Sequence, residues 1–405
     1  MRMKSRFVLA GLIAVGAVLL NSCTSTNGTA TPTGTGFMWV VSQGDQLVRS
    51  FNINLSTGVA SEVGAGAPTG LGPIAIALTP DASALFVANR DDNTISAYSV
   101  NSDGSLPTPC PPPKAANCNA VAASTVAGTP LAVAVDPSGK FLFVANQANQ
   151  ALFPPPNTPD TISVFAIQGT TLTSVGSFAS TGNGPAALAA SPVGNFLYVA
   201  NAFTSTVSIL SYDSNGVLTQ DPTSPVSLCT NCTNPAGLAF SRCSGTTTVT
   251  TNCPTATPPG YLFVANNGSS NISVYSACIQ VTTACPAANG TLSQISGSPV
   301  AAGPHPVSFL VNPARDQVYA VDTSVNQISE YQYSSATGLL TSLSPATAST
   351  GSSPLTGGIT SDGNWAFVPN NGASNVSGYS IGPGGQLATG TSITLVGQPS
   401  AVLIR

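Results

Sequence analysis

The stretch GPIAIALTPDASALFVANRDDNTISAYSV (residues 72–100) contains three short strand patterns separated by turn residues. Large and small apolar side chains alternate over residues 74–78, and residues 85–88 form an apolar run. Residues 94–100 alternate again and are rich in β-branched and aromatic side chains. Pro80 and Asp81 supply turn chemistry after the first strand. The stretch therefore predicts consecutive strands and no helix.

The same unit recurs along the chain with variations. Its second strand ends in an apolar segment followed by Asn or Asp, at residues 86–89, 143–146, 198–201, 263–266, 319–322 and 367–370. Its first strand follows a proline lead, which we assign to Gly72-Pro73, Gly128-Thr129-Pro130, Gly184-Pro185, Asn234-Pro235, Gly303-Pro304 and Ser353-Pro354. Six units at this spacing predict four-stranded propeller blades.

The two ends of the chain supply the parts of a seventh unit. Residues 37–41 match a second strand and residues 46–53 match a third, but no first strand precedes them. The missing first-strand pattern stands at residues 397–404, where the chain ends. The sequence thus predicts an all-β, seven-bladed β-propeller of antiparallel blades over residues 37–405, closed by the C-terminal strand. Such closure pairs edges that would otherwise be exposed.

The repeats also carry a family resemblance. Tyr198-Val199-Ala200-Asn201 and its Phe-Val-Ala-Asn copies resemble the YVTN-type propeller repeat, with alanine for threonine. The proline leads and the Asn/Thr-Ile/Val-Ser strands resemble the wider lactonase-like seven-bladed propeller family. The resemblance implies a propeller fold and a possible lactone hydrolase related to the 6-phosphogluconolactonases. It implies little about function by itself, because propellers host many unrelated activities.

The N-terminus has the pattern of an export signal. Arg2, Lys4 and Arg6 precede an uncharged apolar run over residues 7–20, which is short for a membrane span. The following segment, residues 20–23, resembles a bacterial lipobox and makes Cys23 the expected lipidation site, although Asn21 departs from the usual small or apolar residue. An ordinary secretory signal is the alternative. We expect a signal peptide at 1–22 and a flexible tether at 23–36.

Composition narrows the possible partners. Charged residues make up 6% of the chain, and the formal net charge is −4. Loss of the signal peptide would remove three of the 10 basic residues and none of the 14 acidic ones. No basic patch survives, so we expect no nucleic-acid partner. We expect a monomer without a cofactor, lipid-anchored to a membrane of the bacterial cell envelope and facing away from the cytoplasm.

The cysteines other than Cys23 support export. They form four close pairs, all in segments outside the core strands. We therefore predict the disulfides Cys110–Cys118, Cys229–Cys232, Cys243–Cys253 and Cys278–Cys285. The C-x-x-C spacing of Cys229 and Cys232 leaves zinc as an alternative, for which other loops would have to supply further ligands.

Insertions between strands indicate a recognition face. Residues 147–159 lengthen a connection between the second and third strands of one blade, and residues 242–259 lengthen a turn between first and second strands. Second-to-third connections and blade-to-blade connections share one face of a propeller. We therefore expect the 147–159 loop, Cys229–Cys232 and His305 to lie on the same face, where a protein or glycan could bind.

His305 is the only histidine and the leading catalytic candidate. It lies before a first strand, so we expect it near the mouth of the central channel, where it could act as a general acid or base. Asp322 and Asp160 are the acidic residues considered as its partners. The alternative is that His305 hydrogen-bonds a loop carbonyl.

Polar residues that recur near the same level are candidate binding groups. One position is shared by Asn89, Asn146, Asn201, Asn266, Asn370 and Asp322. A ring of polar groups for a sugar or a metal is one interpretation, but we expect each side chain to tie down the turn that leaves its strand, because the residue recurs from blade to blade. Asp322 and the cluster Arg90, Asp91 and Asp92 break the repeat, so we take these four as candidate binding residues. Solvated surface is the alternative for the cluster.

Two functions follow from these patterns. The sequence favours a non-catalytic protein- or glycan-binding module, because titratable groups are sparse and no phosphate loop, zinc-protease motif or nucleophile elbow occurs. The other is a lactonase-like hydrolase that uses His305. Lys and Arg are few and scattered, which does not suit a phosphorylated lactone.

Overall fold

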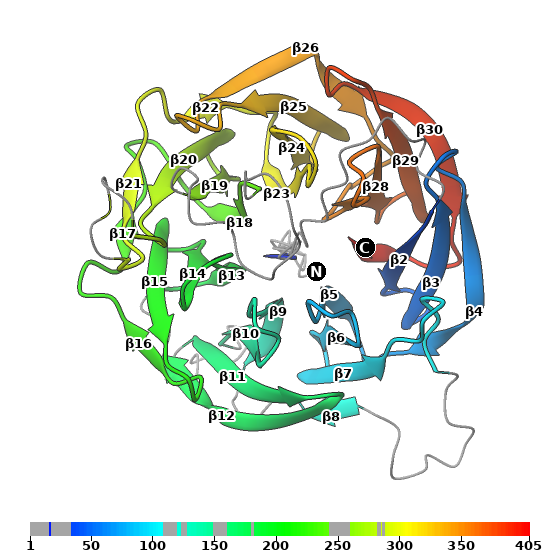
Figure 1. Cartoon of the computed structure of the whole chain (residues 1–405), viewed down its shortest axis with the longest axis horizontal. Helices are drawn as coiled ribbons and strands as arrows, with labels where there is room; N and C mark the ends of the chain where they lie inside the picture. The colour runs from blue at the N-terminus through cyan, green and yellow to red at the C-terminus, as the bar shows by residue number, and fades with distance from the viewer. Residues whose placement is uncertain are drawn as a thin grey trace, which may run out of the picture.

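The computed structural model describes residues 34–107, 128–148, 160–179, 182–242, 260–281, 285 and 288–405, and the backbone of residues 16–17 and 120–122. The described residues form strands and turns with no helix. Seven sheets stand around a central axis, each with its strands stacked outward from that axis (Figure 1). The expected seven-bladed β-propeller is confirmed. None of the described residues forms a helix long and apolar enough to span a membrane.

Each blade has four strand positions, counted from the axis outward. The innermost strands are β31 (Pro399–Ile404), β5 (Pro73–Leu78), β9 (Thr129–Val135), β13 (Pro185–Ala190), β18 (Pro235–Phe240), β23 (Pro306–Val311) and β27 (Gly358–Ile359). The second strands are β2 (Thr35–Ser42), β6 (Ala84–Asn89), β10 (Phe141–Gln147), β14 (Phe196–Asn201), β19 (Gly260–Asn266), β24 (Gln317–Asp322) and β28 (Trp365–Asn370). We number the blades one to seven in this order.

The third and fourth strands complete the blades. The third strands are β3 (Leu47–Asn54), β7 (Thr94–Ser99), β11 (Thr161–Gln168), β15 (Thr206–Tyr212), β20 (Asn271–Ala277), β25 (Gln327–Tyr333) and β29 (Asn375–Ile381). The outer strands are β4 (Ala60–Pro68), β8 (Ala120–Ala122), β12 (Thr171–Ala179), β16 (Leu218–Gln220) with β17 (Val226–Ser227), β21 (Leu292–Gln294) with β22 (Val300–Ala301), β26 (Leu340–Ser349) and β30 (Leu387–Thr394). A further short strand, β1 (Gly16–Ala17), pairs in parallel with β9.

The split repeat closes the ring as expected. β31 pairs antiparallel with β2, with Leu403 opposite Trp39 and Val402 opposite Val40. Blade one is therefore built from both ends of the chain, and the C-terminus lies near the centre of the ring (Figure 1). No blade of the ring is left without its innermost strand.

Neighbouring blades pack through a close contact between an aromatic ring of one blade and a glycine of the next. In blade five Tyr261 is the second residue of β19, and in blade six Gly338 lies in the turn before β26. A Cβ added to Gly338 would come 2.5 Å from the Tyr261 ring, and φ of Gly338 is +75°. The same contact recurs in the pairs Phe37–Gly104, Phe141–Gly216, Phe196–Gly290 and Trp365–Gly58. These positions need glycine because both the space and the backbone conformation exclude a side chain.

Two of the predicted disulfides lie in described residues and both are formed, Cys229–Cys232 and Cys278–Cys285. The zinc alternative for the C-x-x-C pair is wrong, because the two sulfurs are bonded to each other. Cys110–Cys118, Cys243–Cys253, Cys23 and residues 149–159 lie outside the described residues, and so do the predicted signal peptide and tether except for residues 16–17 and 34–36.

Candidate functional site

The candidate site is the end of the ring where the innermost strands begin, which we call the mouth. In five blades the residue before the first proline of the innermost strand has a positive φ. These residues are Gly72, Gly184, Asn234, His305 and Ser353, with φ of 61°, 71°, 54°, 58° and 53°. Glycine, asparagine and histidine enter this left-handed region more readily than other residues. The position is therefore a repeated feature of the backbone.

One sequence assignment at the mouth is wrong. The lead of blade six is His305-Pro306 and not Gly303-Pro304, because Pro306 pairs with Asp322 as Pro73 pairs with Asn89. The segment Gly303–Pro306 contains two proline leads, and only the strand pairing decides between them. His305 thus stands where blades two and four have glycine.

Hydrogen bonds between blades fix this backbone. The His305 N–H donates to Oγ of Ser270, at 3.4 Å, in the second-to-third turn of blade five. The same bond recurs from Gly184 to Asp160, from Asn234 to Ser205 and from Ser353 to Asn326. Sequence reasoning missed these acceptors, although each immediately precedes a third strand. The preceding blade therefore holds the His305 backbone in place.

The His305 side chain is exposed at this mouth. Among the described residues, none forms a hydrogen bond or an ion pair with its imidazole. The alternative of an imidazole bonded to a loop carbonyl is thus not found among them. An accessible imidazole without a competing partner can take a proton from water or donate one to a leaving group.

The two acidic residues considered as partners of His305 have other contacts. Asp160 accepts from the N–H groups of Ala148 and Gly184, both at 2.6 Å, and so joins blades three and four. Asp322 is fully buried below Gly303 and accepts a 2.6 Å hydrogen bond from the Ser329 hydroxyl. Burial raises the pKa of Asp322 to about 7. Neither carboxylate orients the imidazole of His305.

Arg90, Asp91 and Asp92 lie in the second-to-third turn of blade two, on the mouth face. Asp92 accepts hydrogen bonds from the Leu71 N–H and from the Thr94 hydroxyl, at 2.8 and 2.6 Å. Arg90 and Asp91 form an ion pair at 2.8 Å, and half of the Asp91 side chain is exposed. Asp92 thus holds the loop that leads to Gly72, and a binding role for the cluster stays a prediction.

The recurring asparagines join the second and third strands of their blades. The Asn89 amide donates to the hydroxyls of Thr94 and Ser96, both at 2.9 Å. The amides of the four other recurring asparagines donate in the same way to serine hydroxyls on the third strand, namely those of Ser163, Ser208, Ser273 and Ser377. The side chains are buried, which agrees with the expected structural role.

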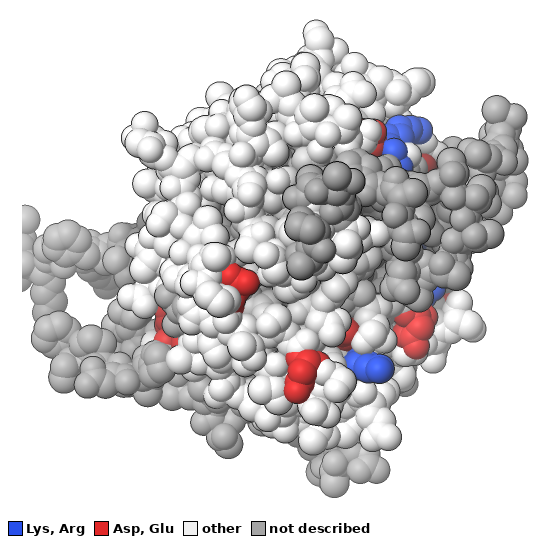
Figure 2. Space-filling view, turned by 60° about the vertical axis from the view of Figure 1, so that its left-hand side comes forward, with Lys and Arg blue, Asp and Glu red and all other residues white. Residues whose placement is uncertain are grey.

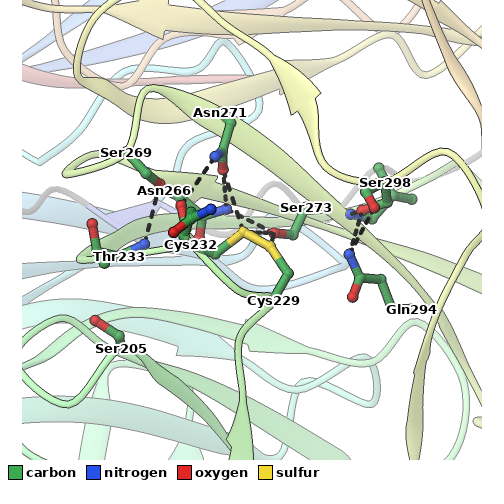
Figure 3. The surroundings of a disulfide bond; sticks show 12 residues. Ser205, Cys229, Cys232, Thr233, Asn266, Ser269, Asn271, Ser273, Gln294 and Ser298 are labelled. Atoms are coloured by element: carbon green, nitrogen blue, oxygen red, sulfur yellow. Dashed lines mark hydrogen bonds between the residues drawn. A yellow bond between two sulfur atoms is a disulfide. The ribbon is translucent and has the colours of Figure 1, made fainter.

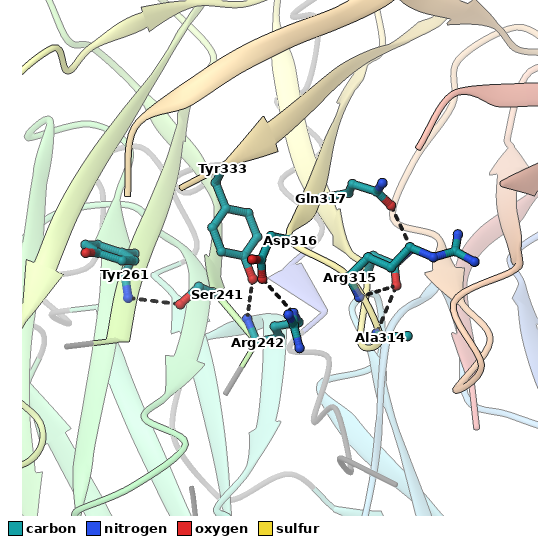
Figure 4. A network of polar contacts seen from close by, with 9 residues as sticks. Ser241, Arg242, Tyr261, Ala314, Arg315, Asp316, Gln317 and Tyr333 are labelled. Carbon is teal, nitrogen blue, oxygen red and sulfur yellow. Dashed lines mark hydrogen bonds and ion pairs between the residues drawn. The ribbon is translucent and has the colours of Figure 1, made fainter. Parts of the chain in front are cut away.

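Charged side chains are sparse on the face that Figure 2 shows. The arginines of the described residues form ion pairs or hydrogen bonds. On the third strand of blade one Arg49 pairs with Asp45 and Glu62, and in the second-to-third turn of blade two Arg90 pairs with Asp91. Toward the other face Arg242 pairs with Asp316, and Arg315 donates to carbonyls and to Asn364; Figure 4 shows both arginines. Within the described residues no group of three or more His, Cys, Asp or Glu side chains could hold a metal ion.

The fold and this mouth define a closed seven-bladed β-propeller. A family model described as "Lactonase, 7-bladed beta-propeller" matches residues 29–230. The chain belongs to this lactonase-like family of seven-bladed propellers. No curated protein matches it.

Solved structures share the fold at low sequence identity. A protein from Bacteroides fragilis, provisionally described as a 6-phosphogluconolactonase, is 15% identical with a TM-score of 0.70, covering 94% of this chain and 100% of its own. The periplasmic gluconolactonase of Pseudomonas aeruginosa is 16% identical with a TM-score of 0.69, covering 92% and 99%. A protein from Lactobacillus plantarum is 17% identical with a TM-score of 0.67, covering 92% and 100%. At such identities these likenesses show the fold alone.

Proposed function

We propose that the protein hydrolyses the ring ester of an unphosphorylated lactone at the mouth, with His305 as general base. The observation that carries the proposal is the exposed His305 imidazole, held at the mouth by a backbone bond to the neighbouring blade. Membership of the lactonase-like family supports a hydrolase over the non-catalytic binding module that composition alone favours.

The chemistry requires one group that moves a proton. The neutral imidazole takes a proton from a water molecule as that water attacks the lactone carbonyl carbon. The tetrahedral intermediate then expels the ring oxygen, and the imidazolium returns the proton to this oxygen as the C–O bond breaks. The product is the open hydroxy acid, and His305 is left neutral for the next turnover.

The charge distribution favours a substrate without phosphate. A phosphorylated lactone needs cations that are free to pair with it. Among the described residues, Arg90 in the second-to-third turn of blade two and Arg49 on the third strand of blade one already pair with carboxylates. Sugar lactones without phosphate and acyl lactones remain as substrate classes that need no such pairing.

The experiment is hydrolysis of a panel of sugar and acyl lactones by the purified chain and by His305→Asn. Asparagine suits this position, because Asn234 has the same left-handed backbone in blade five. We expect turnover by the parent and a loss of at least about 100-fold in kcat/KM for the variant, the usual size of a general-base contribution.

Ser353→Asn is the matched control, since it makes the same residue at the equivalent position of blade seven. It should retain the parent's turnover. Full turnover by His305→Asn would remove His305 from the mechanism. No turnover of any lactone by the parent would overturn the proposal and return the binding module as the leading function.

A further inference from the structure

Blade five breaks the repeat at the mouth face. In blades two, four, six and seven a glycine stands three residues before the first proline, namely Gly70, Gly182, Gly303 and Gly351. A Cβ added to any of these glycines would come within 3.0 Å of the buried Asn or Asp that ends the second strand of the same blade. In blade five this position is Cys232, three residues before Pro235. A sulfur atom therefore lies where these four blades have no side chain.

The two sulfurs share one hydroxyl group (Figure 3). Oγ of Ser273 lies 3.3 Å from Cys229 Sγ and 3.2 Å from Cys232 Sγ. This oxygen also accepts a 2.7 Å hydrogen bond from the Asn266 amide. The Asn266 bond uses a lone pair of the oxygen, so the hydroxyl proton is available to a sulfur. A thiolate formed here would receive that proton as a hydrogen bond.

The two cysteines differ in exposure. Cys232 is 4% exposed, whereas Cys229 is half-buried and the intervening Thr230 and Asn231 are exposed. An incoming thiolate can thus reach the sulfur of Cys229 more easily than that of Cys232. The order of attack and departure in a thiol–disulfide exchange is set by this difference.

We propose that Cys229–Cys232 is a thiol–disulfide exchange site that a dithiol reduces in the folded protein. One thiolate of the dithiol attacks Cys229 Sγ, the bond between the two cysteines breaks, and Cys232 leaves as a thiolate that accepts the Ser273 proton in a hydrogen bond. The second thiol of the dithiol then attacks the mixed disulfide and releases Cys229. The dithiol is oxidised by two electrons and the cysteine pair is reduced.

The loop stays anchored when the disulfide is open. The Cys232 N–H donates to the Cys229 carbonyl at 2.9 Å. The N–H groups of Thr233 and Asn234 donate to the hydroxyls of Ser269 and Ser205, at 3.1 and 3.2 Å. These bonds do not depend on the sulfur–sulfur bond, so reduction does not require unfolding.

The test treats the full oxidised chain with graded dithiothreitol, blocks free thiols with iodoacetamide and quantifies each cysteine by peptide mass spectrometry. Cys278–Cys285 in the same blade serves as a reference pair, since Cys285 is also 4% exposed and Cys278 is also half-buried. We expect Cys229–Cys232 to open with an unchanged circular dichroism spectrum. Opening only together with loss of that spectrum would overturn the proposal.

A second measurement tests the role of the hydroxyl. Ser273→Ala should slow the opening of the disulfide about tenfold, since the departing Cys232 thiolate loses one hydrogen bond to its charged sulfur. In the reduced protein, the same change should raise the pH at which iodoacetamide alkylates Cys232 at half its maximal rate. Ser208→Ala removes the equivalent serine of blade four and should change neither value. Equal opening rates in the parent and Ser273→Ala would remove Ser273 from the site.

Discussion

The hydroxyl of Ser329 donates a 2.6 Å hydrogen bond to Oδ2 of Asp322, at the level where five other blades have a buried asparagine. In those blades the serine accepts from the amide instead, as Ser96 does from Asn89. Oδ1 of Asp322 has no partner among the described residues. Blade six therefore holds a carboxyl group in a site built for an amide.

Asp322→Asn should stabilise the protein at neutral and alkaline pH. Burial raises the pKa of Asp322 from 3.8 to about 7, so the folded protein holds a proton that the unfolded chain releases above about pH 4. The contribution of Asp322 to the unfolding free energy of the parent thus falls as pH rises from about 4 to 7. The variant lacks this contribution and should be more stable than the parent by on the order of 4 kcal/mol at pH 8.

Urea unfolding of both proteins at several pH values checks this expectation. Burial also raises the pKa of Glu330 to about 7, but Glu330 is present in both proteins, so its contribution cancels in the difference. Equal pH slopes for parent and variant would show that Asp322 is ionised at no unusual cost.

Cys23 is expected to carry the lipid anchor, and it can be tested in cells. The full chain expressed in a bacterium should partition with membranes, because several acyl chains on one residue give stable anchoring. Cys23→Ala should move the protein to the soluble or secreted fraction, measured by fractionation and by labelling with a fatty acid. Recovery of both proteins in the soluble fraction, without label, would instead favour an ordinary secretory signal.

The repeat predicted the blades because each strand type carries its own local pattern, and the split between residues 37–53 and 397–404 gave the closure. The site was less accessible to sequence reasoning. The contact that positions His305 joins it to Ser270, 35 residues earlier, and no local pattern encodes such a bond. The lead of blade six was misassigned for a related reason, since strand pairing and not the Gly-Pro dipeptide selects Pro306.

The glycine at each blade junction gives a stability prediction. Gly338→Ala places a methyl group 2.5 Å from the Tyr261 ring at a φ of +75°. The backbone strain costs about 1 kcal/mol and the overpacking about 1 to 3 kcal/mol more. We expect a loss of about 2 to 4 kcal/mol in urea unfolding.

Gly169→Ala is the matched control for this substitution. Gly169 also has a positive φ, of +59°, but an added Cβ meets nothing within 4 Å. It should lose only about 1 kcal/mol, from strain alone. Equal losses in the two variants would mean that the contact with Tyr261 contributes nothing.

Removal of residues 399–405 should prevent the ring from closing. β31 pairs with β2, its Val402 N–H donates to the Thr356 carbonyl of blade seven, and its Ser400 hydroxyl donates to the Pro73 carbonyl of blade two. Without β31 the edge of β2 is exposed, and exposed edges pair with other chains. We expect oligomers by light scattering and loss of a single thermal transition.

A synthetic peptide of residues 397–405 should restore the monomer and a scrambled peptide should not, because the bonds of β31 require its register. A truncated chain that remains a monomer with the parent's transition would show that blade one is stable without its innermost strand.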